Sequence, residues 1–177
     1  MRLGWTTRGA VVLAVALVAS LGGCTVEHTQ NGARAAPVVS QQTLAEVKVV
    51  VKGIEHEVAT LVPRELVTGE NDSVGGSISD CAPGAVSWGS HTSVPVTRPP
   101  DFDELTTDLL EHWPRAGDFE VDLTEGSTGE PRLILRSPAL GNYYIEMIEE
   151  VLQVASASTC FAYDEERDGY AWDIAAE

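Results

Sequence analysis

Apolar and polar residues alternate repeatedly between residues 118 and 161, and this alternation constrains the fold more than any other feature of the chain. Residues 118–124 alternate without exception, so their three apolar side chains share one face of a half-buried strand. Turn-forming residues at 126–129 and 137–142 flank a short apolar strand at 132–136. The pattern predicts a run of antiparallel strands in the second half of the chain.

Residues 143–161 fit two patterns. Tyr143, Ile145 and Met147 alternate as they would in a strand, but positions 145, 148 and 152 also have helical spacing. The β-branched and aromatic residues, together with the strands that precede them, favour two strands joined by a tight turn at 149–150. A helix over the same residues is the alternative.

Residues 43–61 form the first periodic segment. Thr43 and Glu46 match a capping box at its start, and Pro63 marks its end. The valines between 47 and 51 and Gly53 are poor helix formers, so a strand is the alternative. The helix is favoured because the apolar residues recur at steps of three and four: Leu44, Val47, Val51, Ile54, Val58 and Leu61.

A second helix is predicted at residues 101–113. Asp101 and Glu104 match another capping box, and the acidic first turn suits the positive end of the helix dipole. Pro114 ends the segment. Its apolar stripe consists of Phe102, Leu105, Leu109 and Trp113.

The region between these helices is predicted to hold a loop and a strand pair. Residues 65–76 are rich in Gly, Asn and Asp, as loops are. Alternating apolar residues on either side of residues 89–92 predict two strands with their turn at 89–92. The order helix, strands, helix, strands predicts an α+β fold in which two helices pack on one face of a curved antiparallel β-sheet.

The first 23 residues have the features of an export signal. Residues 1–9 contain two arginines and no acid, and residues 10–21 are an apolar run too short to span a bilayer comfortably. The run ends in Leu21-Gly22-Gly23-Cys24, which resembles the lipobox of bacterial lipoproteins. By that resemblance Cys24 becomes the mature N-terminus and carries a thioether-linked diacylglycerol, with acyl chains such as palmitate that hold the protein on a membrane. An ordinary signal peptide that contains a cysteine is the alternative.

These features divide the chain into four parts. We expect a cleaved lipoprotein signal peptide at 1–23, a flexible membrane tether at 24–42, one α+β domain at 43–163 and an acidic tail at 164–177. The chain has 27 acidic and 11 basic residues, a formal charge of −16, and loss of the two signal-peptide arginines takes the mature chain to −18. This charge excludes nucleic acid as a partner and favours a basic envelope protein or a cation.

Two cysteines remain after lipidation of Cys24. Export places Cys81 and Cys160 in an oxidising compartment, so we expect them to form a disulfide that ties the first strand to the last. Two free buried thiols are the alternative. A catalytic cysteine is disfavoured because acidic residues dominate the chain and a reactive thiolate needs a basic setting.

The sequence indicates no catalytic residue, cofactor or metal site. The histidines at 28, 56, 91 and 112 lack a second His or Cys at metal-ligand spacing. Ser90 and His91 put a hydroxyl beside an imidazole, but sequence neighbours on a strand would point to opposite faces. The acidic runs at 101–104 and 164–168 are interpreted as a helix cap and a solvated tail, and neither has the ligand spacing of a calcium loop.

The layout resembles the small actinobacterial lipoproteins of the LppA-like type. The residues that carry the resemblance are Leu21-Gly22-Gly23-Cys24, a short tether, a helix that ends at Leu61-Val62-Pro63, Cys81 before a Trp-bearing strand, and Ser158-Thr159-Cys160. The resemblance implies a membrane-anchored α+β domain with one disulfide, and it brings no catalytic residues.

These observations favour a non-enzymatic lipoprotein on the outer face of the cytoplasmic membrane. Its acidic domain is expected to be a binding or accessory module of the cell envelope. The alternative is an envelope hydrolase or a small-molecule-binding lipoprotein whose site is assembled from residues far apart in the sequence.

Overall fold

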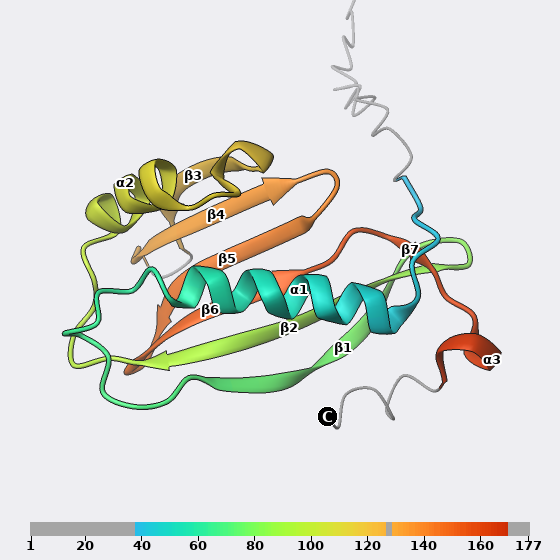
Figure 1. Ribbon diagram of the computed structural model, residues 1–177, viewed down its shortest axis with the longest axis horizontal. Coiled ribbons are helices and arrows are strands. Elements are labelled where there is room, and N and C mark those ends of the chain that lie inside the picture. The colour runs from blue at the N-terminus through green and yellow to red at the C-terminus, as the bar shows by residue number, and fades with distance from the viewer. Residues whose placement is uncertain (1–37, 127–128, 170–177) are drawn as a thin grey trace, which may run out of the picture. The chain divides into compact units, whose positions relative to one another are not determined.

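The computed structural model describes residues 38–126 and 129–169 of the chain, and Figure 1 shows its helices and strands. In chain order the elements are α1 (Leu44–Ala59), β1 (Asp72–Ala82), β2 (Ala85–Pro95), α2 (Phe102–His112), the 3-10 helix η1 (Ala116–Asp118), β3 (Glu120–Glu125), β4 (Pro131–Ser137), β5 (Gly141–Ile148), β6 (Val151–Ala157), β7 (Phe161–Ala162) and α3 (Glu165–Asp168). The predicted α+β class is confirmed.

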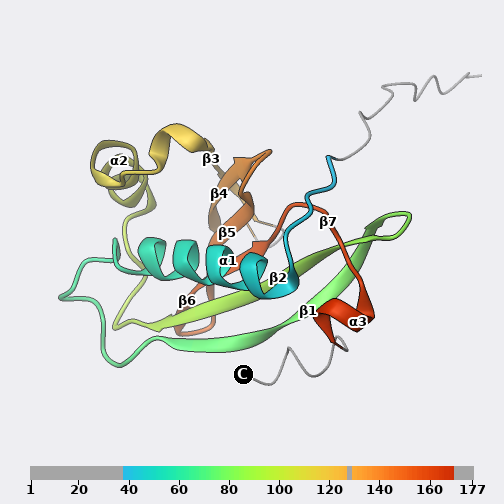
Figure 2. The same cartoon turned by 45° about the vertical axis from the view of Figure 1, so that its right-hand side comes forward.

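The strands form one antiparallel sheet with the order β1-β2-β6-β5-β4-β3, and the short β7 pairs with the other end of β2. Strands β1 and β3 lie at its two edges, so the sheet is not closed. Helix α1 lies against β2 and β6, and α2 lies against β3 and β4. Both helices cover the same face, as Figures 1 and 2 show.

The ambiguous segment at 143–161 is strand, as favoured. Strands β5 and β6 pair from Asn142 with Ala157 to Ile148 with Val151. The two residues between them make the turn, and Glu149 adopts φ 55°, the left-handed conformation that tight hairpin turns use. The capping box of Thr43 and Glu46 at the start of α1 is confirmed as well.

The predicted loop at 65–76 and the predicted turn at 89–92 are wrong in part. Strand β1 begins at Asp72, and the hairpin turn lies at Pro83–Gly84, where Gly84 has φ 72°. Residues 89–92 lie inside β2, whose alternate residues from Val86 to Val94 are all buried. The polar residues Ser90 and Thr92 occupy two of these inward positions, which made one long strand resemble two strands and a turn.

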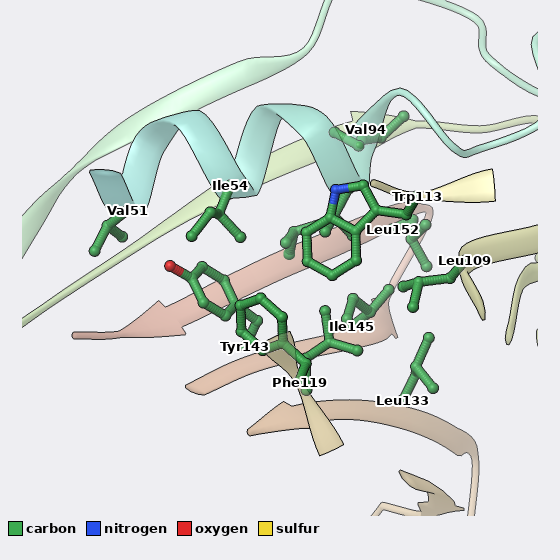
Figure 3. Close-up of a cluster of buried hydrophobic side chains, with 14 of the residues drawn as sticks. Val51, Ile54, Val94, Leu109, Trp113, Phe119, Leu133, Tyr143, Ile145 and Leu152 are labelled. Atoms are coloured by element: carbon green, nitrogen blue, oxygen red, sulfur yellow. The ribbon is translucent and has the colours of Figure 1, made fainter. Parts of the chain in front are cut away.

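Aromatic side chains join α2 to the sheet in the core (Figure 3). Trp113 stacks on Phe119 with ring centroids 5.1 Å apart, and Phe119 meets the edge of Tyr143 at 5.8 Å. Burial raises the pKa of the Tyr143 phenol well above its ordinary value, so the hydroxyl keeps its proton. It donates a hydrogen bond of 3.1 Å to the Leu140 carbonyl. The aliphatic residues around these rings come from both helices and from β2, β4, β5 and β6.

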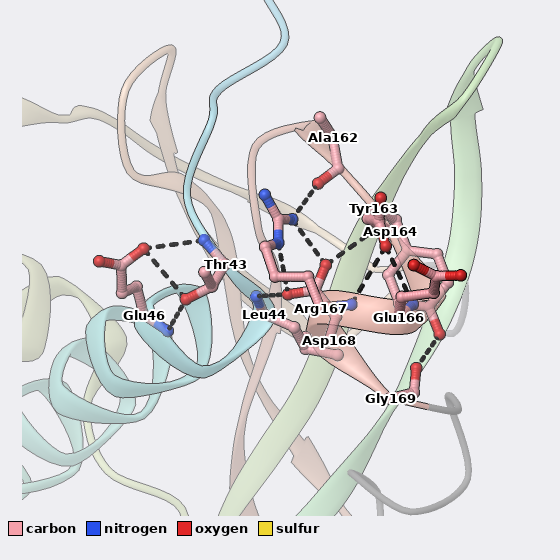
Figure 4. Close-up of polar contacts among 10 residues, drawn as sticks. All are labelled: Thr43, Leu44, Glu46, Ala162, Tyr163, Asp164, Glu166, Arg167, Asp168 and Gly169. Carbon is pink, nitrogen blue, oxygen red and sulfur yellow. Dashed lines mark hydrogen bonds and ion pairs between the residues drawn. The ribbon is translucent and has the colours of Figure 1, made fainter.

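Hydrogen bonds extend into the segments predicted as tether and tail. Ser40 bridges to Phe161, and its carbonyl accepts from the Ala162 amide at 2.9 Å. At the other end, Asp168 accepts a hydrogen bond of 3.1 Å from the Leu44 amide at the start of α1 (Figure 4). The interpretation of 164–168 as a solvated tail is therefore wrong for Asp168, whose side chain is 1% exposed. The domain boundaries at 42/43 and 163/164 stay predictions.

Candidate functional site

A buried carboxylate lies at the centre of the contact between α1 and the sheet. Glu55 is on the inward side of α1 and has no solvent-exposed surface. It faces Ser90 and Thr92 from β2 and Ser156 from β6, all of which are buried too. Strand alternation places Ser90 and Thr92 on the face that α1 covers.

Four donors surround the Glu55 carboxylate. Its Oε1 accepts hydrogen bonds of 2.5 Å from both Ser90 Oγ and Ser156 Oγ. Its Oε2 accepts one of 2.9 Å from Thr92 Oγ1 and one of 3.2 Å from Lys52 Nζ. A carboxylate has about four lone-pair directions, so this one is saturated.

The saturated carboxylate limits what the cluster can do chemically. The three hydroxyls donate to Glu55 and are covered by α1, so they are neither exposed nor next to a free base as a nucleophile needs to be. Each buried side-chain polar atom of the described residues has a hydrogen-bond partner. The cluster therefore positions α1 on the sheet and fixes the side chain of Lys52.

Sequence reasoning missed Glu55, although the signal was present. Position 55 is four residues after Val51 and next to Ile54, which places it on the buried stripe of the helix. An acid on that stripe requires buried donors opposite it. The inward Ser and Thr residues of β2 and β6 are those donors.

A pocket opens beside this cluster, with a volume of about 660 Å³. Helix α1 contributes Lys48, Lys52 and His56, and Thr92 comes from β2. The segment between α1 and β1 supplies the remaining lining residues, which are Arg64, Val67, Gly69, Glu70 and Asn71. Lys52 and Thr92 belong to both the pocket and the Glu55 cluster, so the buried carboxylate lies directly behind the basic wall of the pocket.

A second pocket, of about 690 Å³, is lined by residues of η1, β3, β4 and β5 and of the segment before β7. Its charged lining residues are Asp118, Glu120 and Arg136. Arg136 is paired with Asp122 at 3.3 Å. This pocket therefore has mixed charge and no concentration of one chemical group.

Glu57 makes the main polar link between the two helices. Its Oε2 accepts hydrogen bonds from Trp113 Nε1 at 3.0 Å and from Arg115 Nε at 2.9 Å. Burial raises the pKa of the Glu57 carboxyl, but the hydrogen bonds from Arg115 and Trp113 lower it more, so the net pKa lies below its ordinary value. Glu57 is thus an ionised structural partner of α2.

The predicted disulfide between Cys81 and Cys160 is confirmed. It joins residues 79 positions apart, with their Cα atoms 6.1 Å from each other. It ties the end of β1 to the residue that precedes β7, so the alternative of two free thiols is wrong. The lipid-attachment residue Cys24 and the lipobox residues Leu21, Gly22 and Gly23 lie outside the described residues, as does His28.

The remaining candidate residues do not come together in space. His56 and His112 are exposed, and His91 lies on the sheet face opposite to Ser90. Asp101 accepts hydrogen bonds from the Asp103 and Glu104 amides, so its interpretation as a helix cap is confirmed. Within 38–126 and 129–169, no group of three or more His, Cys, Asp or Glu residues could hold a metal ion. No helix in these ranges is long and apolar enough to cross a membrane.

The similarity of this chain to known proteins is limited to structure. No protein-family model and no curated protein matches the sequence. Among solved structures, the chain is similar to a DUF4853 family protein from Actinomyces odontolyticus, with a TM-score of 0.43 and 15% sequence identity. The similarity covers 73% of this chain and 76% of that one.

Proposed function

We propose that this chain is an exported lipoprotein, anchored to the outer face of the cytoplasmic membrane by lipid on Cys24. In this proposal, its domain is a non-catalytic binding or accessory module of the cell envelope. The observation that carries the export is the disulfide between Cys81 and Cys160, because such bonds persist in oxidising compartments and are rare in the cytosol. The lipobox at residues 21–24 and the LppA-like layout support the anchor.

Two features support a binding role over catalysis. The buried hydroxyls of β2 and β6 are all committed to Glu55, so they are part of the packing and unavailable to a substrate. The mature chain is strongly acidic, and its surface attracts basic partners or cations while it repels polyanions. A basic envelope protein or a cation is therefore the expected partner of the surface as a whole.

Labelling with a palmitate analogue in a lipoprotein-processing bacterium tests the anchor. We expect the full chain to be labelled and to fractionate with membranes, and we expect Cys24→Ala to lose both properties. Thr25→Ala is the matched control, because it changes the next residue and keeps the lipobox. Equal labelling of Cys24→Ala and the unaltered chain overturns the anchor.

Recovery of partners from membranes tests the binding role. A stoichiometric basic partner that is released as the salt concentration rises supports it, since salt screens exposed charges. The absence of any partner at every salt concentration counts against a protein partner for the acidic surface.

A small-molecule-binding lipoprotein is the second candidate. The observation that favours it is the pocket beside Glu55, which is assembled from residues between 48 and 92 on a helix, a strand and a loop. Its volume is within the usual range for ligand pockets.

A further inference from the structure

We infer that the pocket lined by Lys48, Lys52, His56 and Arg64 binds a small anion through an oxyanion group, either a carboxylate or a phosphate. The inference rests on the second candidate function above and is independent of the lipid anchor. It also differs from the expectation for the acidic surface as a whole, which favours basic partners.

The basic residues of α1 form a stripe along one side of the pocket. Lys48, Lys52 and His56 are four residues apart from one another, so they lie in a row on the helix. Lys48 and Lys52 are the only two lysines of the chain, and both lie in this row. Lys52 pairs with Glu55 at 3.2 Å. The row therefore concentrates the lysines of the chain beside one pocket.

Arg64, in the segment between α1 and β1, adds another cation to the lining of the pocket. It is exposed and forms no ion pair with any residue in the described ranges, whereas Arg115, Arg132, Arg136 and Arg167 each pair with an acid. A guanidinium matches two oxygens of a carboxylate or phosphate at once. Among the lining residues, Glu70 is the one acid.

The buried cluster holds one of these cations in place. Glu55 Oε2 and the His91 carbonyl accept hydrogen bonds from Lys52 Nζ, and the same nitrogen lies 5.7 Å from the centroid of the Trp88 ring. These contacts hold the Lys52 side chain in place, and with 23% of its surface exposed it still lines the pocket. A preordered ammonium lowers the entropic cost of binding an anion.

The negative charge of the whole chain favours a small anionic ligand over a long one. A long polyanion would extend beyond the pocket and meet the acidic surface, which repels it. In the pocket wall, the charges of Lys48, Lys52 and Arg64 outnumber those of Glu55 and Glu70. A ligand that fits about 660 Å³ experiences mainly these local charges, because salt screens more distant charges beyond about 8 Å at physiological ionic strength.

NMR titration tests the inference. The isotope-labelled full chain, purified in detergent, is titrated with inorganic phosphate and separately with acetate at constant ionic strength. We expect saturable changes in the amide chemical shifts of α1 and residues 64–71 with at least one of the two anions, and the anion that binds more tightly identifies the preferred oxyanion. Arg64→Ala should weaken binding about tenfold, as expected for one lost hydrogen-bonded charge pair. Lys48→Ala should weaken it similarly, with thermal unfolding measured in parallel.

Arg98→Ala is the matched control, because Arg98 is also exposed, forms no ion pair with a described residue and lies outside the pocket. It should leave the affinity unchanged. Equal weakening by Arg98→Ala and Arg64→Ala overturns the inference, because it would mean diffuse charge attraction. Shifts that do not saturate with either anion, or that lie elsewhere, also overturn it. The palmitate-labelling result does not affect this experiment, so failure of the pocket and failure of the anchor are distinguishable.

Discussion

Glu55 and Ser156 share a hydrogen bond of 2.5 Å although they lie 101 positions apart in the sequence. This contact connects the first helix to β6, and the same carboxylate oxygen accepts from Ser90 on the neighbouring strand β2. A buried carboxylate is costly unless its lone pairs are filled. The rotation of α1 about its axis is therefore fixed, because only one rotation brings Glu55 to all of its donors.

Removal of the Glu55 carboxylate should destabilise the domain. Glu55→Ala leaves three buried hydroxyls and Lys52 without their acceptor, and we expect a loss of about 3 kcal/mol in the free energy of unfolding. Glu55→Gln keeps one carbonyl oxygen but places an amide donor against Thr92 and Lys52, so its loss should be smaller, about 1–2 kcal/mol. Urea denaturation with the disulfide intact measures both.

Glu111→Gln is the control for the loss of one negative charge, because Glu111 is an exposed residue of α2. We expect it to change the free energy of unfolding by less than about 0.5 kcal/mol. If Glu55→Gln proves as stable as Glu111→Gln, the carboxylate does not hold α1 on the sheet.

Periodicity predicted α1, α2, β5 and β6 because each of these elements has one clearly apolar face. The stripe of α1 and the alternation of β5 and β6 correspond to the buried residues of these elements, and the export argument led to the disulfide of Cys81 and Cys160. The continuous strand β2 could not be predicted, because Ser90 and Thr92 take buried positions that the pattern reserves for apolar residues.

The apolar stripe of α1 contained the signal that Glu55 is buried, but the rest of the candidate site could not be predicted, for a related reason. The donors of Glu55 come from two strands that are adjacent only in the folded sheet, and the basic pocket combines α1 with a loop and β2. The spacing of residues along the chain does not indicate which strands are adjacent or which segments meet at the pocket. The same applies to Asp168, whose acidic surroundings resemble a solvated tail until its contact with Leu44 is known.

Loss of the disulfide should destabilise the chain by about 4 kcal/mol, because a loop closed over 79 residues restricts the unfolded state strongly. The double variant Cys81→Ser/Cys160→Ser and the chemically reduced unaltered protein should both show this loss in urea denaturation. Cys24→Ala is the control that removes a cysteine outside the pair. A double variant as stable as Cys24→Ala would contradict the prediction.

Gly141 should tolerate no side chain. It has φ 91°, and a Cβ there would collide with the Ala157 carbonyl oxygen and lie 2.9 Å from the Ser158 Cα. We expect Gly141→Ala to cost about 3 kcal/mol, from the left-handed backbone and the collision together. Gly84→Ala is the matched control, because Gly84 has φ 72° with open space around it, and it should cost only about 1–2 kcal/mol. If urea denaturation shows the same loss of unfolding free energy for both variants, β6 moves to accommodate the added methyl group, and the prediction is wrong.

Stability at low pH should depend on Asp168. Burial raises the pKa of its carboxyl, but hydrogen bonds from Arg167 and from the Asp164 and Leu44 amides lower it more, so the folded-state pKa lies below its ordinary value. As the pH falls, the unfolded chain therefore takes up this proton before the folded chain does. The stabilisation is complete above the unfolded-state pKa of about 3.9 and is lost as the pH falls through the folded-state pKa.

The Asp168→Asn variant should accordingly lose less stability than the unaltered chain between about pH 6 and about pH 3. At neutral pH the variant should be the less stable of the two, because the amide keeps the shape of the carboxylate and loses its ion pair with Arg167 (Figure 4). Asp108→Asn, at an exposed position of α2, controls for the removal of one carboxylate. Urea denaturation across this pH range measures the slopes, and parallel slopes for Asp168→Asn and the unaltered chain would show that α3 does not stabilise the start of α1 through this side chain.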